Sequence, residues 1–333
     1  MLGPEQLAAG ERAEAAGDYL AAAAAYRSVT TLSDAELAAD GYFRLGRVTW
    51  RQGRFDGALT AFASARALAE RAGKMELMAR VENGIGAVHY ARGDYDAAQR
   101  AYRDAGSHSA DPTMHAKIVL NLGVIENIRG NFEAARAEYE SAYQLFVGCG
   151  DDANATLAVH NRGMVEADLE LWDQADASFL TALELATVGD NREMIAKTLV
   201  NRSEVLLEQA TPAEAVAHCD RALAIYAEVG DEVGRAEALR WRGRALMVLG
   251  DLVEAERGIA EALHIAVRSN ARLLEGEASR DLGELHALRG DHAGALKKLR
   301  AALATFADLG AERDIAGVRS LIERVAAQRN GPG

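Results

Sequence analysis

The sequence predicts an all-α protein in which eight helix pairs stack one after another into a solenoid that ends in a single C-terminal helix. Three observations support this fold class. Small side chains recur with a period near 40 residues, a glycine-rich turn position follows each by seven residues, and alanine stands five residues beyond each turn position. The 333 residues also exceed the roughly 250–300 at which one compact core stops growing, so a stack of local cores is favoured.

A small residue marks the first helix of each predicted pair. These residues are Gly10, Gly46, Gly86, Gly123, Gly163, Ser203, Gly243 and Gly283. The turn positions that follow them are Gly17, Gly53, Gly93, Gly130, Glu170, Ala210, Gly250 and Gly290. Most are glycine, which adopts at low cost the left-handed conformation that ends a helix. We therefore expect the first helix of each pair to end at these positions.

The second helix of each pair carries alanine and a large residue at relative positions 0 and 4, and position 7 is again alanine in seven pairs and Val29 in the first. These three positions lie on one helical face. The first alanines are Ala22, Ala58, Ala98, Ala135, Ala175, Ala215, Ala255 and Ala295. The large residues are Tyr26, Phe62, Tyr102, Tyr139, Phe179, Cys219, Ile259 and Leu299. Small residues on both helices let the backbones approach to the short end of the usual spacing of about 8–10 Å, while the large residue fills the seam.

This register resembles the tetratricopeptide repeat over residues 5 to about 312. The usual repeat has a shorter period and a closing proline, so the longer period here is similar to that of Pins-type adaptors, kinesin light chain and bacterial peptide-sensing regulators. The resemblance implies a right-handed superhelix forming a single solenoid over residues 1–333, with a capping helix at 315–328. The repeats are expected at approximately 5–30, 34–72, 75–109, 112–149, 152–189, 191–229, 232–269 and 271–310.

One repeat is shorter than its neighbours. The missing turn coincides with the segment 106–112, where Asp111 is placed to cap a helix that begins at Pro112. We expect a local change of stacking angle between the third and fourth repeats. At a later helix start, Thr211 and Glu214 have the spacing of a capping box, with Pro212 at the first helical position.

Composition narrows the range of partners. Thirty-seven basic and fifty acidic residues give a net charge of −13, which repels nucleic acid. The sequence has neither a membrane-spanning window nor a leader pattern, so we expect a cytoplasmic protein without membrane contact.

Arginine greatly outnumbers lysine, which favours a bacterial source with a GC-rich genome. Cys149 and Cys219 lack ligand spacing, and no metal or cofactor is predicted. The oligomeric state is not predicted.

The resemblance implies that the first helices line a concave groove that binds an extended peptide. Asn121, Asn161 and Asn201 stand two residues before successive small positions and form a row of amides. An amide both donates and accepts, so each can pair with the N–H and C=O of a peptide backbone. The alternative is that these asparagines bond to a neighbouring helix or are merely exposed.

Basic residues occupy further positions that face the groove: Arg47, Arg51, Arg80, Lys117, Lys197, Arg240, Arg244 and Arg280. Because guanidinium groups bind carboxylates through two hydrogen bonds, they favour a protein or peptide partner with an acidic segment. The same rows hold the acids Glu204, Glu208, Glu237 and Glu284, so salt bridges on a solvated helix face are the alternative.

Two other sets of side chains are candidates. Trp50 and Tyr90, with Phe43, are predicted either to form an apolar pocket for a side-chain anchor or to belong to the core. The second set consists of the arginines directly before three successive small residues, at a position where the tetratricopeptide repeat usually has leucine. They are expected either to reach the groove edge or to pair with acids such as Glu166. The arginines are Arg162, Arg202 and Arg242.

The sequence carries no established catalytic motif. It lacks GxxxxGK, HExxH and GxSxG, and the stretch from Gly84 to Gly86 has His89 where a dinucleotide fingerprint needs its third glycine. We therefore predict a non-catalytic adaptor that binds an extended peptide segment. The alternatives are a peptide-responsive regulator that changes its superhelical pitch on binding, and an enzyme with its active site in the concave cavity.

Overall fold

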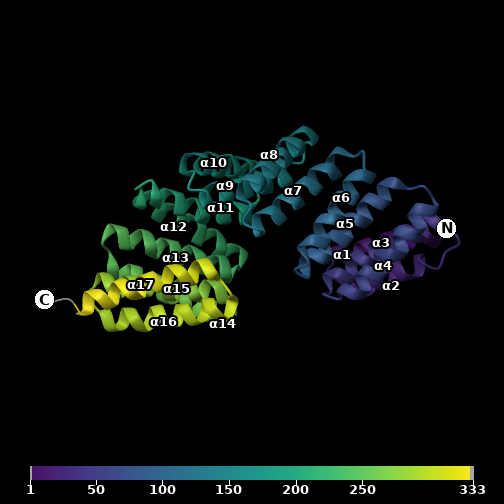
Figure 1. Ribbon diagram of the computed structural model, residues 1–333. Helices are drawn as coiled ribbons and strands as arrows, with labels where there is room; N and C mark the ends of the chain where they lie inside the picture. The colour runs from purple at the N-terminus through teal and green to yellow at the C-terminus, as the bar shows by residue number, and fades with distance from the viewer. Residues whose placement is uncertain (1, 331–333) are drawn as a thin grey trace. The chain divides into compact units, whose positions relative to one another are not determined.

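The computed structural model describes residues 2–330 (Figure 1). Within this range the chain forms seventeen α-helices and no strand, which confirms the predicted all-α fold of eight pairs and one C-terminal helix. Met1 and residues 331–333, which the expected solenoid includes, lie outside the described residues. The chain divides into two compact units, with the boundary between Ala158 and Val159.

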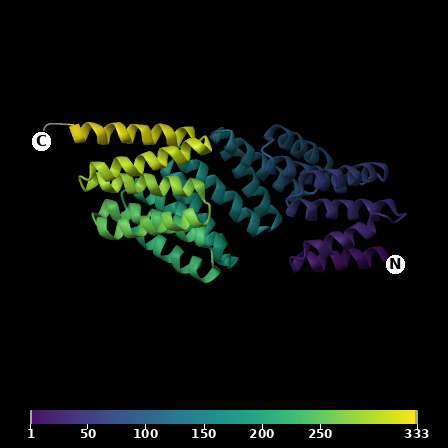
Figure 2. The ribbon, with the colours of Figure 1, turned by 90° about the horizontal axis from the view of Figure 1, so that it is seen from below.

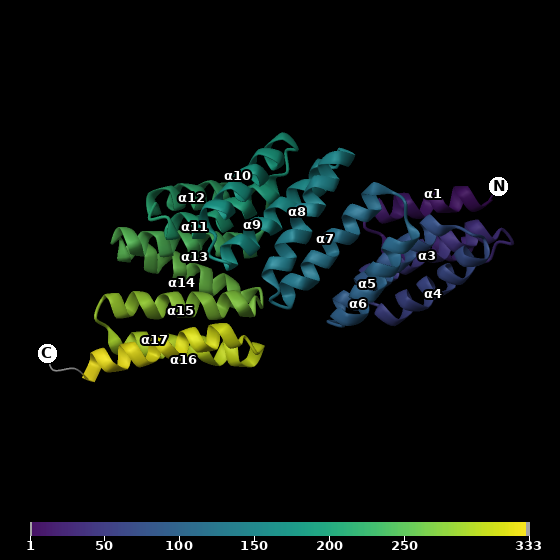
Figure 3. The ribbon, with the colours of Figure 1, turned by 45° about the horizontal axis from the view of Figure 1, so that its top comes forward.

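The helices of the first unit form four antiparallel pairs. Figure 3 shows α3 beside α4 and α5 beside α6. Odd-numbered helices up to α15 are the first helices of their pairs, and even-numbered helices are the second helices. The bounds in this unit are α1 Leu2–Ala15, α2 Tyr19–Val29, α3 Ala35–Arg51, α4 Phe55–Arg71, α5 Met75–Ala91, α6 Tyr95–His108, α7 Pro112–Ile128 and α8 Phe132–Cys149.

The second unit contains most of α9, the remaining pairs and the C-terminal helix. In this unit α15 contacts both α13 and α17, and Figure 2 shows the last helices side by side. The bounds are α9 Asp152–Asp168, α10 Trp172–Val188, α11 Arg192–Glu208, α12 Pro212–Val229, α13 Glu232–Leu249, α14 Leu252–Arg268, α15 Arg272–Leu288, α16 His292–Leu309 and α17 Glu312–Asn330.

The seams between paired helices are as close as the pattern of small residues predicts. A Cβ atom added to Gly86 would lie 2.5 Å from Cε1 of Tyr102, and one added to Gly243 would lie 2.4 Å from Cγ1 of Ile259. All eight alanines that begin the seam pattern are fully buried. The large seam residues Tyr26, Phe62, Tyr102, Tyr139, Phe179, Cys219, Ile259 and Leu299 are at most 3% exposed. The predicted seam is therefore confirmed in every pair.

Serine replaces glycine in one seam, and the large residue there is a cysteine. The Cys219 thiol donates to the Ser203 hydroxyl over 3.3 Å, and that hydroxyl donates to the Leu199 carbonyl over 2.8 Å. Burial raises the pKa of Cys219 to about 12, so its thiol stays protonated at neutral pH. Because the smaller thiol occupies the place of an aromatic ring, this seam has room for a hydroxyl.

The turns inside the pairs are left-handed, as predicted. At these positions φ lies between 57° for Ala210 and 86° for Gly250. Two of these turn positions hold a residue other than glycine, namely Ala210 and Glu170, which has a φ of 59°. Left-handed backbone costs a residue with a Cβ atom roughly 1–2 kcal/mol, so these two turns are strained relative to the glycine turns.

Two helix starts test the capping predictions. The side chain of Asp111 accepts from the backbone N–H of Thr113 and Met114 and caps α7 at Pro112, as predicted. The capping box at Thr211 is wrong. Its hydroxyl donates to the Leu206 carbonyl over 2.9 Å, because the left-handed turn brings Thr211 back to the end of α11. Proline does occupy the start of α12.

The short third repeat corresponds to a short second helix. α6 has 14 residues, whereas α4 has 17 and α8 has 18. The accompanying change of stacking angle stays a prediction. Among residues 2–330, no helix is both long and apolar enough to cross a bilayer.

Candidate functional site

A cavity of about 680 Å³ lies in the second unit, and we call it the second-unit cavity. All of its lining residues come from first helices and from α17, as predicted for the groove face of a helix-pair stack. They are Met164, Asp168, Asn201, Glu204, Glu237, Arg240, Trp241, Arg244, Leu273, Glu277, Arg280, Glu284, Arg313, Asp314, Gly317, Leu321 and Arg324.

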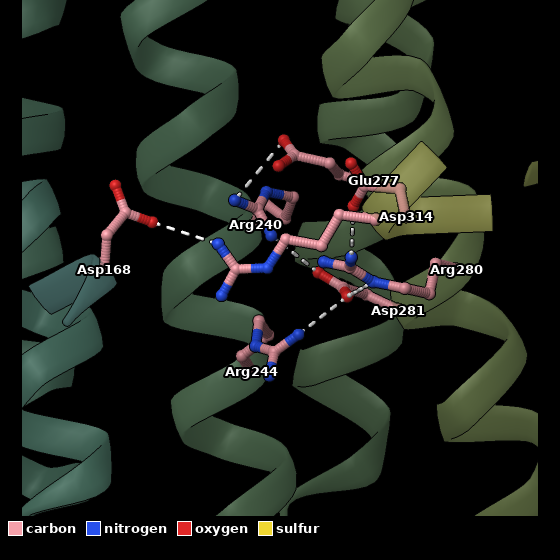
Figure 4. A network of polar contacts seen from close by, with 8 residues as sticks. Asp168, Arg240, Arg244, Glu277, Arg280, Asp281 and Asp314 are labelled. Carbon is pink, nitrogen blue, oxygen red and sulfur yellow. Dashed lines mark hydrogen bonds and ion pairs between the residues drawn. The ribbon is translucent and has the colours of Figure 1, made fainter. Parts of the chain in front are cut away.

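A buried carboxylate binds three of the arginines that line the cavity. Asp281 of α15 accepts from Nη1 of Arg240 over 3.1 Å and from Nη1 of Arg244 over 2.9 Å (Figure 4). Its neighbour Arg280 donates through Nε over 3.4 Å. Burial alone would raise the pKa of Asp281, but the three guanidinium groups hold it below its usual range. The carboxylate is therefore charged and has its charge compensated inside the protein.

The same arginines bind a second set of groups. Nη2 of Arg240 lies 3.4 Å from Glu277, and Nη1 of Arg280 donates to Asp314 of α17 over 3.2 Å. The guanidinium carbon of Arg240 also lies 4.6 Å from the centroid of the Trp241 ring. The Arg240 side chain is nearly fully buried, and its Nε atom has no hydrogen-bond acceptor among the described residues.

An ion pair joins the last helix to the first helix of this unit. Nη1 of Arg313, at the start of α17, donates to Oδ1 of Asp168, at the end of α9, over 3.2 Å. Both residues line the second-unit cavity, and both also line an adjoining pocket of about 330 Å³. The cavity is therefore bounded on opposite sides by helices that the chain connects only through the intervening pairs.

Three carboxylates in the cavity have no such compensation. Glu204, Glu237 and Glu284 lie on α11, α13 and α15, and none forms an ion pair or hydrogen bond with the described residues. Burial raises the pKa of each, although nearby arginines oppose the shift. The described residues contain no group of three side chains suited to hold a metal ion. The cavity is instead a charged site with unsatisfied acceptors.

Sequence comparison identifies the repeat. One profile of the tetratricopeptide repeat matches residues 37–105 and 153–228, and a second matches residues 84–149 and 257–309. Together they cover well over half of the chain. The chain belongs to the tetratricopeptide-repeat family. No curated protein sequence matches it. Tetratricopeptide repeats build scaffolds for protein–protein interaction, and this protein has that scaffold.

Solved structures share the fold of this tetratricopeptide-repeat protein. A Rap protein complexed with competence and sporulation factor is 13% identical, with a TM-score of 0.62 over 98% of each chain. BtubC (BKLC) from P. vanneervenii is 20% identical, with a TM-score of 0.58 over 66% of this chain and 92% of that chain. The apo form of RapI is 14% identical, with a TM-score of 0.62 over 81% of this chain and all of that chain. At these identities the likeness concerns the fold.

The predicted row of asparagines is partly engaged within the tetratricopeptide-repeat scaffold. Nδ2 of Asn121 donates to Asn83 on α5 over 3.1 Å, and Nδ2 of Asn201 lies 3.2 Å from Nε2 of His160 on α9. Asn161 forms no hydrogen bond with the described residues. Burial lowers the pKa of His160 to about 3, so its ring is neutral and can accept from Asn201. Asn201 also lines the second-unit cavity.

The predicted basic residues fall into two structural groups. Arg240, Arg244 and Arg280 line the second-unit cavity and are paired as described above. In the first unit, Arg47 and Arg51 pair with Glu14 of α1 at 2.9 and 3.6 Å.

Arg80 lies 3.7 Å from Asp40, and its guanidinium carbon is 4.4 Å from the Phe43 ring centroid. It lines a cavity of about 750 Å³ between α3 and α5. Lys117 and Lys197 are exposed, with no ion pair to the described residues.

The predicted aromatic residues separate in the structure. Trp50 packs against the buried cluster around Phe43 and Phe62, so it contributes to the core. Tyr90 is 38% exposed, and its ring centroid lies 5.9 Å from that of Tyr95. Trp50 and Tyr90 therefore lie in two different environments and do not form one shared apolar pocket.

The three arginines at the leucine position bind side chains of second helices. Nε of Arg202 donates to Asp176 over 2.6 Å, and Nε of Arg242 donates to Asp220 over 2.6 Å. Arg162 is engaged in the same way with α10, where its Nε donates to Ser178 over 3.0 Å, and it also lies 3.7 Å from Glu166. The structure therefore favours pairing over exposure at the groove edge.

Sequence reasoning assigned no role to the buried carboxylate that binds three arginines of the cavity lining. Asp281 stands at the same repeat position as Asn201, two residues before the small residue, so the repeat register does place it on the groove face. The contact between Asp168 and Arg313 had no such signal, because the two residues are separated by 145 positions and belong to different repeat positions.

Proposed function

We propose that this tetratricopeptide-repeat protein is a non-catalytic scaffold that binds an extended peptide segment of a partner protein in the second-unit cavity. The single observation that carries this proposal is that first helices of successive pairs and α17 together line a cavity of about 680 Å³, mainly with polar side chains. An extended segment presents a donor and an acceptor at every residue, and such a wall can bind both. The expected setting is the bacterial cytoplasm, without nucleic-acid or membrane contact.

The asparagines support a role in holding the peptide backbone. In the second unit, the Asn161 amide forms no hydrogen bond with the described residues. Asn201 uses its Nδ2 atom in the contact with His160, and its side-chain oxygen is not used in that contact. Exchanging these residues for alanine should weaken binding of peptides irrespective of their sequence, because the amides would contact the backbone only.

A peptide-responsive regulator is the second candidate, and one observation favours it. The Arg313–Asp168 ion pair connects both sides of the cavity, so a ligand that separates or strengthens this contact would shift α17 relative to α9. The Rap protein that shares the fold was solved with competence and sporulation factor. A regulator predicts that peptide binding changes the hydrogen exchange of α17, whereas a static scaffold predicts protection confined to the cavity.

Panning a phage library of random peptides on the full-length protein tests the proposal. Gly317 of α17 lines the cavity, and nothing lies within 4 Å of a Cβ atom placed on it. Gly317→Trp should therefore fill the cavity without disturbing the core. We expect enriched peptides to bind this variant at least about tenfold more weakly than the wild type.

Gly148→Trp is the matched control, because Gly148 is also a helical glycine with open space around its Cβ position but lies on α8, in the first unit. Peptides that bind both variants as tightly as the wild type would contradict binding in the cavity. A library that yields no enriched peptide would contradict peptide binding itself.

A further inference from the structure

The charges that line the second-unit cavity do not balance once the internal ion pairs are removed. Four of its five arginines are paired with carboxylates, which leaves only the exposed Arg324. Of its six carboxylates, three are paired and three are not. The unpaired carboxylates are Glu204, Glu237 and Glu284. The free charge presented to a ligand is therefore negative, and the arginines that favoured an acidic ligand are already occupied.

The arginine between these glutamates explains the pattern. Glu204, Arg244 and Glu284 share one repeat position on successive first helices, directly after the small residue. Arg244 is the member that could have neutralised its neighbours, but it donates to the buried Asp281 at 2.9 Å. Because Arg244 is bound to Asp281, neither glutamate of the row forms an ion pair with it, and Glu237 forms no ion pair either.

We infer that the second-unit cavity selects a peptide segment that inserts a lysine or arginine side chain among Glu204, Glu237 and Glu284. The inference rests on the proposed function and adds the chemical class of the ligand. A partly buried carboxylate is unfavourable unless a cation or a hydrogen-bond donor reaches it. A lysine ammonium or an arginine guanidinium supplies both, and its aliphatic stem suits the apolar wall that Leu273 and Leu321 provide.

A second observation points to a ligand that also carries an acceptor. Arg240 is 4% exposed and lines the cavity, yet its Nε donor has no acceptor among the described residues. The Nε donor of Arg244 is in the same state. A peptide combines carbonyl acceptors with a cationic side chain, and a small adjustment of either guanidinium would let a carbonyl reach it. A free polyamine offers the cation without the acceptor.

The test measures the affinity of the full-length protein for short peptide pools, acetylated and amidated at their ends, in which one position is lysine, arginine, glutamate or alanine and the others are mixed uncharged residues. We expect the lysine and arginine pools to bind at least about tenfold more tightly than the glutamate and alanine pools. Spermidine is measured beside them, and it should bind more weakly than the lysine pool.

Two triple variants assign the preference to the cavity. Glu204→Gln, Glu237→Gln and Glu284→Gln together should abolish the preference for basic pools while the binding of uncharged pools persists. The control exchanges Glu193, Glu214 and Glu323, which are exposed and lie outside the cavity lining, for glutamine. This control changes the net charge equally and should keep the preference.

The outcomes separate the two levels of the argument. Pools that bind without preference, or that favour glutamate, would overturn the cationic specificity and leave peptide binding intact. Equal loss of the preference in both triple variants would assign it to net charge and overturn the site. Tight binding of spermidine with no binding of any pool would overturn the peptide as ligand, and no binding at all would overturn the proposed function as well.

Discussion

Arg313 of α17 donates to Asp168 of α9 over 3.2 Å, although 145 residues separate them in the chain. The contact spans the second-unit cavity, yet the Arg313 side chain is 78% exposed. Exposed ion pairs contribute about 0–1 kcal/mol, so this pair is too weak to hold the unit together. We therefore expect it to bias the position of α17 and not to determine the fold of the unit.

Removing this ion pair should therefore loosen α17 without unfolding the protein. For Arg313→Ala we expect the free energy of unfolding to fall by less than about 1 kcal/mol, while the amides of the first turns of α17 exchange faster. Urea denaturation and hydrogen exchange by mass spectrometry measure the two effects. Arg257→Ala, which removes another exposed ion pair, should leave α17 unchanged. A cooperative loss of stability would contradict the assigned role.

Asp281 should behave in the opposite way, because its carboxylate is buried under three arginines. Asp281→Asn leaves those guanidinium groups without their counter-charge, which is expected to lower the free energy of unfolding by about 3–5 kcal/mol. Urea denaturation measures it, with Asp308→Asn at an exposed ion pair as the control. A loss similar to that of the control would show that Arg240 and Arg244 do not depend on Asp281.

The pH dependence of stability should separate Asp281 from the three free glutamates. The pKa of Asp281 is lowered by folding, so its contribution is present above its unfolded-state pKa and is lost as pH falls through its folded-state pKa.

The pKa of Glu204, Glu237 and Glu284 is raised by folding, so their charged forms lower stability at neutral pH. The triple glutamine variant should therefore be more stable than the wild type at pH 7. The difference should shrink as pH falls through the raised pKa values toward the unfolded value of about 4.3. Urea denaturation at a series of pH values gives the curve, and a difference that grows on acidification would contradict the burial of these groups.

The close seams predict a large effect of a single methyl group. Gly86→Ala places Cβ 2.5 Å from the Tyr102 ring, and the overpacking should lower the free energy of unfolding by about 1–3 kcal/mol. Gly148→Ala places its Cβ in open space, with no atom within 4 Å. It should raise the free energy of unfolding by about 0.5–1 kcal/mol, because alanine favours the helical conformation more than glycine does. Thermal unfolding compares them, and equal melting temperatures would mean that the seam can expand.

The two strained turns predict stabilising substitutions. Ala210→Gly and Glu170→Gly remove a Cβ atom from left-handed backbone and should each raise the free energy of unfolding by about 1 kcal/mol. Gly130→Ala introduces the same strain at an equivalent turn and should lower it. Urea denaturation of all three variants decides the matter. Stability that falls in Ala210→Gly would show that the larger conformational entropy of glycine in the unfolded chain outweighs the relief of strain.

The fold was predictable because its determinants are local. A glycine such as Gly86 and the ring of Tyr102 lie in adjacent helices of one pair, so their sequence spacing repeats and can be recognised. The left-handed turn at Ala210 was predictable for the same reason, since its repeat register identified it even without glycine. The capping box at Thr211 failed because that turn returns the side chain to the carbonyl of Leu206.

The candidate site was less predictable because its charges are compensated between repeats. The sequence placed Arg240 and Arg244 on the groove face, but their partner Asp281 lies one repeat further along the chain. Which acids remain without a cation depends on rotamers of long side chains on several helices. The row of asparagines illustrates the same limit, because Asn201 faces both His160 and the cavity.

Each seam is completed within its own pair, and this locality has an evolutionary consequence. Tyrosine, phenylalanine, cysteine, isoleucine and leucine all fill the same place opposite a small residue, so a duplicated repeat brings its own seam with it. It also brings the contacts that join successive pairs, such as the one between Phe62 and Gly84 of the next pair. Tandem duplication of a repeat therefore adds a first helix, and with it a further set of side chains that can line a cavity. Afterwards only the residues facing the hollow need to diverge for the protein to acquire a different partner.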